Sequence, residues 1–285
     1  MKKESTPVSE IPNLEKEDKA IEELILSLFD IYGYDFRNYS KAHVKRRVLN
    51  RMRLLYMDSI DELNQLVVTE TEIAYQLIGD LSITVTEMFR DPEFYVTIRK
   101  EIIPLLKTWS YLRIWHAGCS TGEEVYSMAI LLKEAGLLNR TQIYATDFNQ
   151  EALKRADDGI YAFKDIQKYA VNYRTAGGED EFSKYYSAQY DSAIINKELK
   201  ERIVWADHNL VTDSDFAEVH LVFCRNVLIY FNRELQNQVH ETLFKSLVRG
   251  GVLCLGNKEN IRFTEYENHY DVISNKHRIY KKKYS

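Results

Sequence analysis

The chain has few cysteines, little net charge and no long apolar run. Its three cysteines in 285 residues form no closely spaced pair, which argues against a disulfide framework. No run of about 20 apolar residues occurs, so we expect no membrane-spanning segment. The polar N-terminus lacks the apolar core of a secretory signal, and we therefore expect a cytoplasmic protein. A net charge of −5 gives no support for a surface that neutralises nucleic-acid phosphates.

Several catalytic arrangements are also missing. The sequence has no obvious Ser/His/Asp or Cys/His arrangement and no cluster of metal ligands, so we predict no metal site. Its seven histidines are scattered, and we interpret each as a surface or structural residue. Triad-type nucleophilic catalysis and metal-assisted hydrolysis are therefore not favoured.

The first part of the chain predicts a helical domain. Residues 1–16 are polar and charged, and we interpret them as a flexible leader. Apolar residues then recur at helical spacing. The segments with this pattern are residues 20–31, 40–56 with Ser40 as the N-cap, 59–66 and 71–81. We therefore expect an all-helical domain over residues 17–90.

The second part alternates strands and helices, which indicates an α/β domain over residues 91–285. A helix opens at Asp91-Pro92. The predicted strands are 112–117, 142–146, 203–205, 220–223, 251–255, 271–274 and 278–281, with helices at 123–135 and, capped by Asn149, at 151–156. This order favours a mostly parallel sheet covered on both faces. Residues 161–201 break the pattern without a long apolar helix, and we interpret them as an inserted substructure.

Two features at strand ends indicate a nucleoside cofactor. The loop from Gly118 to Gly122 joins the first strand to its helix, where small residues let a ligand approach the backbone. The alternative for this loop is a plain tight turn. Asp147 ends the next strand, 25 residues after Gly122, and its carboxylate can accept hydrogen bonds from both hydroxyls of a ribose. The alternative for Asp147 is helix capping in Thr-Asp-Phe-Asn.

The same loop separates two classes of cofactor. It lacks the G-x-G-x-x-G pattern that brings a helix N-terminus to a pyrophosphate, so nicotinamide-dependent redox chemistry is not favoured. S-adenosylmethionine has no phosphate to bind. The acidic Glu123 on this loop would suit its cationic, hydrogen-bond-donating group.

Three separated segments resemble the CheR family, the chemotaxis receptor methyltransferases. They are SITVTEMFRDP at 82–92, STGEE at 120–124 and CRNVLIYF at 224–231. The resemblance implies an N-terminal all-helical domain followed by a Rossmann-like class I methyltransferase domain. That domain would contain a seven-stranded sheet and a small inserted antiparallel β subdomain. The implied cofactor is S-adenosylmethionine, with S-adenosylhomocysteine as its product.

The resemblance also implies which residues line the cofactor site. They are Thr84, Thr86, Arg90, Gly118, Glu123, Asp147, Asn209, Leu210, Arg225 and Asn226. Arg90 and Tyr230 would lie nearest the chemistry as catalytic residues. The alternative for Arg90 is a salt bridge with Asp91 or Glu93, and the alternative for Tyr230 is an interdomain core aromatic. Thr84 departs from the family pattern, in which asparagine is common.

The implied reaction transfers the methyl group to glutamate side chains of a chemoreceptor or related helical signalling protein. A glutamate carboxylate has a reference pKa of about 4.3 and is ionised at neutral pH, so no general base is required. We expect Arg90 to orient the carboxylate and Tyr230 to fine-tune the site. The alternative function is a regulatory module that binds the cofactor without turnover.

The substrate protein is expected to bind at two places. Arg46 and Arg53 lie on a basic helix that resembles the family element facing the acidic helical bundle of a receptor. The alternative is a solvated helix face. In the family, the β subdomain, here residues 161–201, can bind a receptor tail peptide as an added strand. Neither nucleic-acid binding nor direct membrane insertion is expected.

Overall fold

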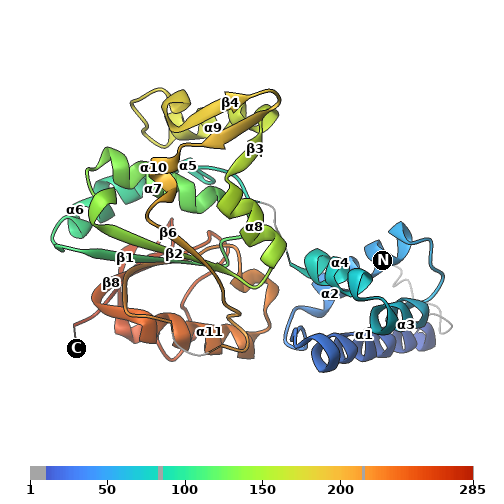
Figure 1. Ribbon diagram of the computed structural model, residues 1–285. Coiled ribbons are helices and arrows are strands. Elements are labelled where there is room, and N and C mark those ends of the chain that lie inside the picture. Colours follow the sequence, from blue (N-terminus) through green and yellow to red (C-terminus); the bar gives the residue numbers. More distant parts are fainter. Residues whose placement is uncertain (1–10, 83–85, 214–215, 285) are drawn as a thin grey trace, which may run out of the picture. The chain divides into compact units, whose positions relative to one another are not determined.

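Figure 1 shows the computed structural model of the chain, which describes residues 11–82, 86–213 and 216–284. Contacts within the chain define two compact units. The first comprises Met1–Ile83 with Tyr230–Leu235, and the second comprises Thr84–Ile229 with Gln236–Ser285. No helix in the described ranges is long and apolar enough to cross a membrane.

The first unit is helical, as the sequence predicts. Its helices are α1 (Ile11–Tyr32), α2 (Lys41–Leu54), α3 (Ile60–Thr69) and α4 (Thr71–Leu81). Apolar side chains at helical spacing, such as Leu24 and Leu28, are buried in its core. α1 ends before Gly33, whose φ of 78° suits a left-handed C-terminal turn. Ser40 is the N-cap of α2, but its hydroxyl makes no capping hydrogen bond.

α1 begins earlier than the sequence predicts. It starts at Ile11, so residues 11–16 belong to a helix and not to a loose leader. Pro12 lies in the first turn, where a missing N–H costs no helical hydrogen bond. The lysines and glutamates that follow are good helix formers, although they give no apolar periodicity. Residues 1–10 lie outside the described residues.

The boundary between the units differs from the predicted one at residue 90. Residues 86–90 group with the second unit, because Met88 and Phe89 are fully buried in its core. The distant segment Tyr230–Leu235 groups with the helical unit, where the N–H of Ser40 donates to the carbonyl oxygen of Tyr230 at 2.7 Å. A stretch from late in the sequence therefore completes the N-terminal unit.

The second unit is built on a seven-stranded sheet in the order β6-β2-β1-β7-β8-β10-β9. The strands are β1 (Leu112–Ala117), β2 (Thr141–Asp147), β6 (Ile203–Asp207), β7 (Val219–Cys224), β8 (Leu247–Leu255), β9 (Tyr270–Ser274) and β10 (Ile279–Lys282). Strands β6, β2, β1, β7 and β8 run parallel, and β10 pairs antiparallel with both β8 and β9. The predicted mostly parallel, seven-stranded sheet is confirmed.

Helices cover both faces of this sheet (Figure 1). α7 (Glu123–Glu134) and α8 (Gln150–Asp158) lie on one face, and α11 (Arg233–Ser246) lies on the other. α7 carries a continuous apolar run and is buried almost throughout. The helix predicted to open at Asp91-Pro92 is present in three pieces. They are α5 (Pro92–Thr97), the π-helical turn η1 (Ile98–Ile102) and α6 (Ile103–Leu106).

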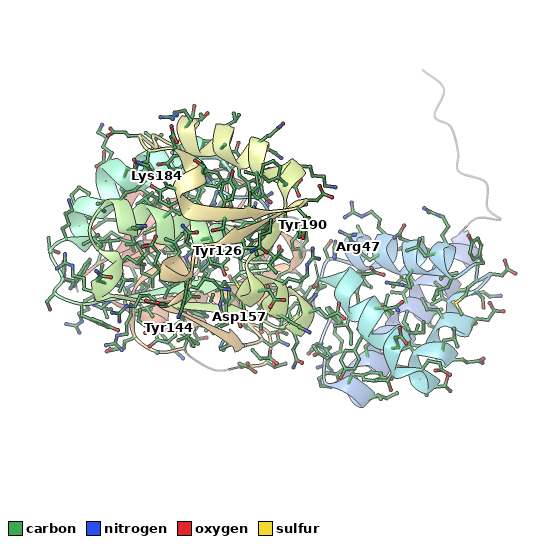
Figure 2. The ribbon with its side chains drawn as sticks, turned by 45° about the horizontal axis from the view of Figure 1, so that its top comes forward. Arg47, Tyr126, Tyr144, Asp157, Lys184 and Tyr190 are labelled. Carbon is green, nitrogen blue, oxygen red and sulfur yellow. The ribbon has the colours of Figure 1, made fainter. Side chains whose placement is uncertain are left out.

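The inserted region between α8 and β6 contains a helix that the sequence analysis did not predict. Its elements are β3 (Ile160–Ala162), α9 (Phe163–Thr175), η3 (Phe182–Tyr185), β4 (Tyr186–Gln189), β5 (Ser192–Ile195) and α10 (Lys197–Lys200). The strands form the expected small antiparallel sheet, in the order β3-β5-β4. α9 buries Ile166, Tyr169 and Tyr173, a helical stripe that an aliphatic pattern does not detect. Tyr190, at the turn between β4 and β5, is fully exposed (Figure 2).

A partly buried carboxylate fastens this region to α7. Glu134 accepts hydrogen bonds from the hydroxyls of Tyr173 and Tyr185, and it pairs with Arg99 at 2.6 Å. Burial, with the Glu134 carboxylate beside it, raises the pKa of Tyr173 to about 12. The Tyr173 hydroxyl therefore remains a donor at neutral pH. The Glu134 carboxylate joins three elements, because it contacts Tyr173 of α9, Tyr185 of η3 and Arg99 of η1.

Glu134→Ala should lower the free energy of unfolding by about 2–4 kcal/mol, because Arg99 and two tyrosine hydroxyls lose their acceptor. Urea unfolding followed by circular dichroism measures this. Glu198→Ala is the matched control, since Glu198 forms an exposed ion pair with Lys133, the neighbour of Glu134. The control should change the free energy by less than about 1 kcal/mol. Equal losses in the two variants would contradict the prediction.

Candidate active site

The candidate active site lies at the edge of the sheet where the carboxyl ends of the parallel strands meet. Ligands of open α/β sheets bind outside this edge. Because β6, β2, β1, β7 and β8 run in the same direction, the loops that follow them share it. These loops carry most of the residues that the sequence predicts for the cofactor site.

The loop after β1 is packed against its neighbours. Gly118 donates its N–H to the carbonyl oxygen of Thr146 at 2.8 Å. Gly118 and Gly122 have φ values of 73° and 90°. A Cβ on Gly118 would lie 2.6 Å from Val227, and one on Gly122 would lie 2.9 Å from Ala156. The glycines therefore let neighbouring protein segments approach, whereas the sequence indicated the approach of a ligand.

Asp147 is nearly buried at the end of β2. Its carboxylate oxygens accept the N–H groups of Ser120 at 2.8 Å and Asn149 at 2.9 Å. The cap of α8 is Asn149, whose side chain accepts the N–H of Ala152, so helix capping does not explain Asp147. Burial raises the pKa of Asp147, and the two N–H donors oppose that shift. The N–H of Phe148 also hydrogen-bonds this carboxylate, and since a carboxylate accepts about four hydrogen bonds, it can accept a further donor.

Glu123 opens α7 with a buried carboxylate. Its Oε2 accepts a hydrogen bond from the Thr121 hydroxyl at 2.7 Å, and Tyr169 of α9 hydrogen-bonds the same side chain. Burial raises the pKa of Glu123. Within the described part of the chain, no basic side chain forms an ion pair with Glu123 or Asp147. Such acceptors suit a ligand that brings hydrogen-bond donors or positive charge, as S-adenosylmethionine does.

Arg90 lies between two residues with unusual backbone conformations. Phe89 and Asp91 have φ values of 54° and 56°, a left-handed region that residues other than glycine rarely adopt. The N–H of Phe89 donates to the hydroxyl of Ser127 on α7 at 2.8 Å. Asp91 and Glu93, the carboxylates proposed as alternative partners of Arg90, each pair with a different basic side chain. Backbone strain of this kind concentrates at functional sites.

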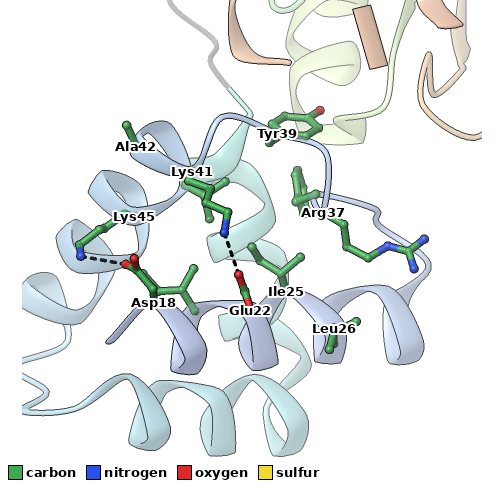
Figure 3. A pocket seen from close by; sticks show the side chains of 12 residues that line it. Asp18, Glu22, Ile25, Leu26, Arg37, Tyr39, Lys41, Ala42 and Lys45 are labelled. Carbon is green, nitrogen blue, oxygen red and sulfur yellow. Dashed lines mark hydrogen bonds and ion pairs between the residues drawn. The ribbon is translucent and has the colours of Figure 1, made fainter. Parts of the chain in front are cut away.

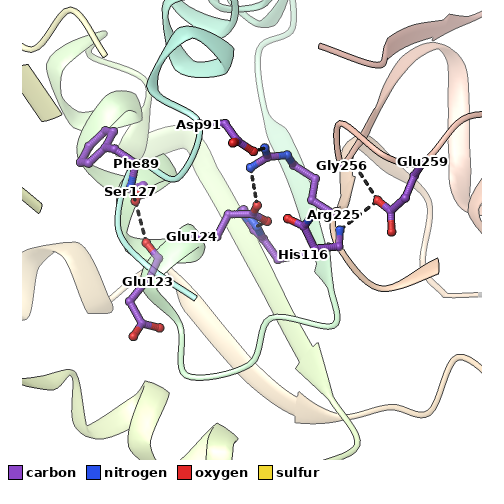
Figure 4. Close-up of polar contacts among 10 residues, drawn as sticks. Phe89, Asp91, His116, Glu123, Glu124, Ser127, Arg225, Gly256 and Glu259 are labelled. Atoms are coloured by element: carbon purple, nitrogen blue, oxygen red, sulfur yellow. Dashed lines mark hydrogen bonds and ion pairs between the residues drawn. The ribbon is translucent and has the colours of Figure 1, made fainter. Parts of the chain in front are cut away.

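A buried network of charged side chains holds this segment (Figure 4). Arg225 donates through Nη2 to Asp91 at 2.8 Å and through Nη1 to Glu124 at 3.0 Å. Nδ1 of His116 lies at hydrogen-bond distance, 3.1 Å, from the other oxygen of Glu124. Burial acts to raise the pKa of Glu124, but His116 and Arg225 outweigh it and lower the pKa.

The side chain of Arg225 is enclosed by protein. It is 1% exposed, and its guanidinium lies 3.9 Å above the ring of Phe94. The sequence analysis expected a cofactor contact at this position. Because the side chain is committed to Asp91 and Glu124, the main chain is the part of Arg225 that can face a ligand.

A second buried carboxylate holds the loop after β7. Oε2 of Glu259 accepts the N–H groups of Asn226 at 2.9 Å and Gly256 at 2.6 Å, and Oε1 accepts that of Ile229 at 3.3 Å. Burial raises the pKa of Glu259, and these donors oppose the shift. Asn226 has a φ of 62°. Glu259 therefore fixes the strained turn that presents Asn226 at the edge.

Three further predicted cofactor residues, Thr86, Asn209 and Leu210, lie in segments next to this centre. Asn209 and Leu210 follow β6, and Oδ1 of Asn209 accepts the N–H of Val211 at 3.0 Å. Thr86 is half-buried in the segment before Phe89. Thr84 lies outside the described residues.

Tyr230 belongs to the helical unit. Its half-buried ring lies 4.9 Å from the imidazole of His43 on α2. Burial lowers the pKa of His43. Arg90 and Tyr230 thus lie in different compact units, and their meeting in one site stays a prediction.

The predicted substrate-facing residues of α2 are accessible. Arg46 and Arg53 lie two turns apart, are exposed, and form no ion pair among the described residues. Lys45 and Arg51 differ, because they pair with carboxylates of α1 and α4. α2 therefore uses Lys45 and Arg51 inside its unit, whereas Arg46 and Arg53 expose their charge to solvent.

The helical unit also has a cavity of about 420 Å³ between α1 and the segment 36–45 (Figure 3). Apolar side chains such as Ile25 and Tyr39 line it, and the ion pair between Lys41 and Glu22 lies at its rim. None of the predicted site residues lines this cavity, so it is separate from the candidate active site.

Known proteins match both units. The family model "CheR methyltransferase, SAM binding domain" matches residues 84–279, and "CheR methyltransferase, all-alpha domain" matches residues 19–82. A methyltransferase named Cher3 from Pseudomonas putida is 46% identical over 265 residues, covering 93% of this chain and 97% of its own length. A chemotaxis protein methyltransferase from Listeria innocua is 31% identical over 231 residues, covering 80% of this chain and 85% of its own.

The sheet order, the buried carboxylates at its edge and these matches agree on the S-adenosylmethionine-dependent methyltransferases as the class. A cofactor-binding module without turnover is not favoured, because the relatives are named as methyltransferases. Within this class, the chain belongs to the CheR family.

The sequence analysis missed three residues that shape the site. Glu124 adjoins the predicted Glu123, but its role depends on an arginine 101 positions away. Glu259 lies in a polar loop with no periodic pattern, and Tyr169 lies on the helix that was not predicted. A pair of adjacent acidic residues at a helix start is the one local signal, and it does not say which of them faces the ligand.

Glu259→Gln should weaken S-adenosylhomocysteine binding about tenfold, because an amide NH2 group then faces main-chain N–H donors and loosens the Asn226 turn. Titration calorimetry measures the affinity. Glu265→Gln changes an exposed carboxylate in the same loop and should leave the affinity within about twofold. An unchanged affinity in Glu259→Gln would show that Glu259 does not position the site.

Proposed function

We propose that this protein transfers the methyl group of S-adenosylmethionine to glutamate side chains of a chemoreceptor or related helical signalling protein in the cytoplasm. The products are glutamyl methyl esters and S-adenosylhomocysteine. The main support is the main-chain position of Arg90, between two left-handed residues that hydrogen bonds to Ser127 and Arg225 hold beside the carboxyl edge of the sheet. A guanidinium carried by a fixed main chain suits a carboxylate substrate.

The reaction needs orientation more than acid or base catalysis. Bound S-adenosylmethionine supplies an electrophilic methyl group on a positively charged sulfur. The substrate carboxylate, with a reference pKa of about 4.3, is already ionised. Burial raises the pKa of Cys119 well above its usual range, so this thiol is no competing nucleophile. The protein's task is therefore to hold the carboxylate in line with the methyl group.

Arg90 is the residue that orients the substrate carboxylate in this proposal. Its guanidinium binds one oxygen while the other attacks. Too strong an interaction would stabilise the anion before the reaction, because only contacts that strengthen toward the transition state accelerate it. Tyr230 adjusts the same centre from the helical unit.

The cofactor is held by the buried acceptors. Asp147 accepts hydrogen bonds from the ribose hydroxyls, and Glu123 binds the amino group of the methionine part. Asn209, Leu210 and Asn226 flank the ligand in this proposal. Gly118, Thr86 and the main chain of Arg225 line the rest of the cofactor site. Thr84 adds a hydroxyl.

The relatives named as chemotaxis protein methyltransferases favour a chemoreceptor as the partner. Arg46 and Arg53 supply positive charge for its acidic helical bundle. A tail peptide of the receptor can add to β4, which pairs only with β5 among the described residues. A groove of about 520 Å³ along these two strands, lined by residues such as Gln189 and Ile194, gives room for its side chains.

The proposed ester has a chemical signature. Wild-type protein incubated with methyl-labelled S-adenosylmethionine and the cytoplasmic fragment of a chemoreceptor should transfer label to the fragment. Mild alkali should release that label as methanol, because esters hydrolyse and N-methyl groups do not. Label that stays on the fragment would contradict glutamate esterification.

In the same assay, Arg90→Ala should reduce kcat by about 100-fold, because the carboxylate loses its orientation. Thermal unfolding should change little. Lys276→Ala is the matched control, since Lys276 pairs with Glu93 near Arg90 in an exposed ion pair. Equal rates in wild type and Arg90→Ala would remove Arg90 from the mechanism.

A further inference from the structure

The loop after β8, residues 256–264, is held in place by three buried or half-buried side chains. We call it the β8 loop. Glu259 fixes its start to the turn after β7. His240 of α11 hydrogen-bonds the main chain of the next residue, and Tyr280 of β10 hydrogen-bonds the main chain of Ile261. The loop is therefore preorganised by contacts with α11, with β10 and with the turn after β7.

The side chains that this loop presents are exposed. Phe263 is 81% exposed and has a φ of 63°, an outlier for a bulky residue. Its N–H donates to Glu267 at 2.9 Å, which maintains the conformation. Lys258 and Arg262 are exposed as well, and neither pairs with a carboxylate in the described ranges. An aromatic ring and two basic groups thus face solvent from a fixed backbone.

The position of the loop connects these side chains to the active site. It leaves β8 at the carboxyl edge, on the same side of the sheet as the loops that hold the cofactor. Glu259 joins it directly to the turn of Asn226. A protein that brings a glutamate side chain to this edge meets the β8 loop beside it.

We propose that the β8 loop is a docking surface for the glutamate-bearing helical segment of the substrate protein. Phe263 packs on an apolar patch of that segment, and Lys258 and Arg262 pair with its acidic residues. This inference rests on the proposed function and adds a contact on the catalytic unit to the basic surface of α2. Aromatic and arginine side chains are typical anchors of binding energy, and a backbone that is already fixed loses little conformational freedom on binding.

The charge of the β8 loop indicates which partner it binds, and the strained backbone of Phe263 indicates a role other than stabilising the fold. Lys258 and Arg262, which form no ion pair among the described residues, fit an acidic surface, and a segment rich in glutamate supplies one. The left-handed conformation of Phe263 is unfavourable for the fold alone, and glycine would relieve it. If Phe263 served only the stability of the fold, glycine would serve it better at this position. A phenylalanine that binds the substrate protein, in contrast, has a role that glycine cannot fill.

The experiment measures binding of a chemoreceptor cytoplasmic fragment and methyl transfer to it. Phe263→Gly and Arg262→Glu should each raise the Kd and KM for the fragment about tenfold, equivalent to about 1.4 kcal/mol. Both variants should keep kcat and the S-adenosylhomocysteine affinity within about twofold of wild type. The melting temperature of Phe263→Gly should be unchanged or higher.

The controls lie at the opposite edge of the sheet. Tyr111→Ala removes an exposed aromatic before β1, and Lys107→Glu reverses an exposed charge there. Both should keep the Kd within about twofold. An unchanged Kd in Phe263→Gly and Arg262→Glu, or a lower melting temperature with glycine, would overturn the docking surface. A wild-type protein that binds the fragment but transfers no alkali-labile methyl would instead refute the proposed function, and the docking surface would still be judged by the Kd values.

Discussion

The second unit depends on the charge of Arg225, which lies in the core beside the active edge. Because its side chain is 1% exposed, its charge must be compensated inside the protein. Asp91 and Glu124 supply that compensation, and they lie at the N-terminal ends of two different helices. Asp91 follows Arg90, and Glu124 follows Glu123. The two ion pairs therefore position Arg90 and Glu123, two predicted site residues, through their neighbours in the chain. Arg225 can do this without its side chain contacting the cofactor.

The acidic residues at this edge divide into two groups according to their partners. Glu123 and Glu124 are adjacent, yet burial raises the pKa of the first, while His116 and Arg225 lower the pKa of the second against the effect of burial. Glu124 pairs with groups of the protein, whereas Glu123 and Asp147 form no ion pair with a basic side chain in the part of the chain that the structure describes. One short motif thus contributes a structural carboxylate and, beside it, the carboxylate that the sequence predicts as a cofactor contact.

Local patterns predicted the parallel sheet, the loop of Gly118 and the acidic end of β2, because each has its own signal in neighbouring residues. The helix α9 was missed, since its buried stripe is mostly tyrosine. The role of Arg225 was also missed, because its partners lie 101 and 134 positions away. The grouping of Tyr230 with the helical unit likewise depends on contacts between distant segments. Residue types at the site were predictable from the sequence, whereas long-range partners require the fold.

Hydrogen exchange in Arg225→Lys tests the central claim, that one guanidinium bridges both carboxylates and holds the Arg90 segment. Lysine keeps the charge but has no fork to bridge two partners. The main-chain N–H groups of Phe89 and Phe94, which donate to Ser127 and Asp91, should exchange at least about tenfold faster than in wild type. Those of β1 should be unchanged. Unchanged protection at Phe89 and Phe94 would contradict the claim.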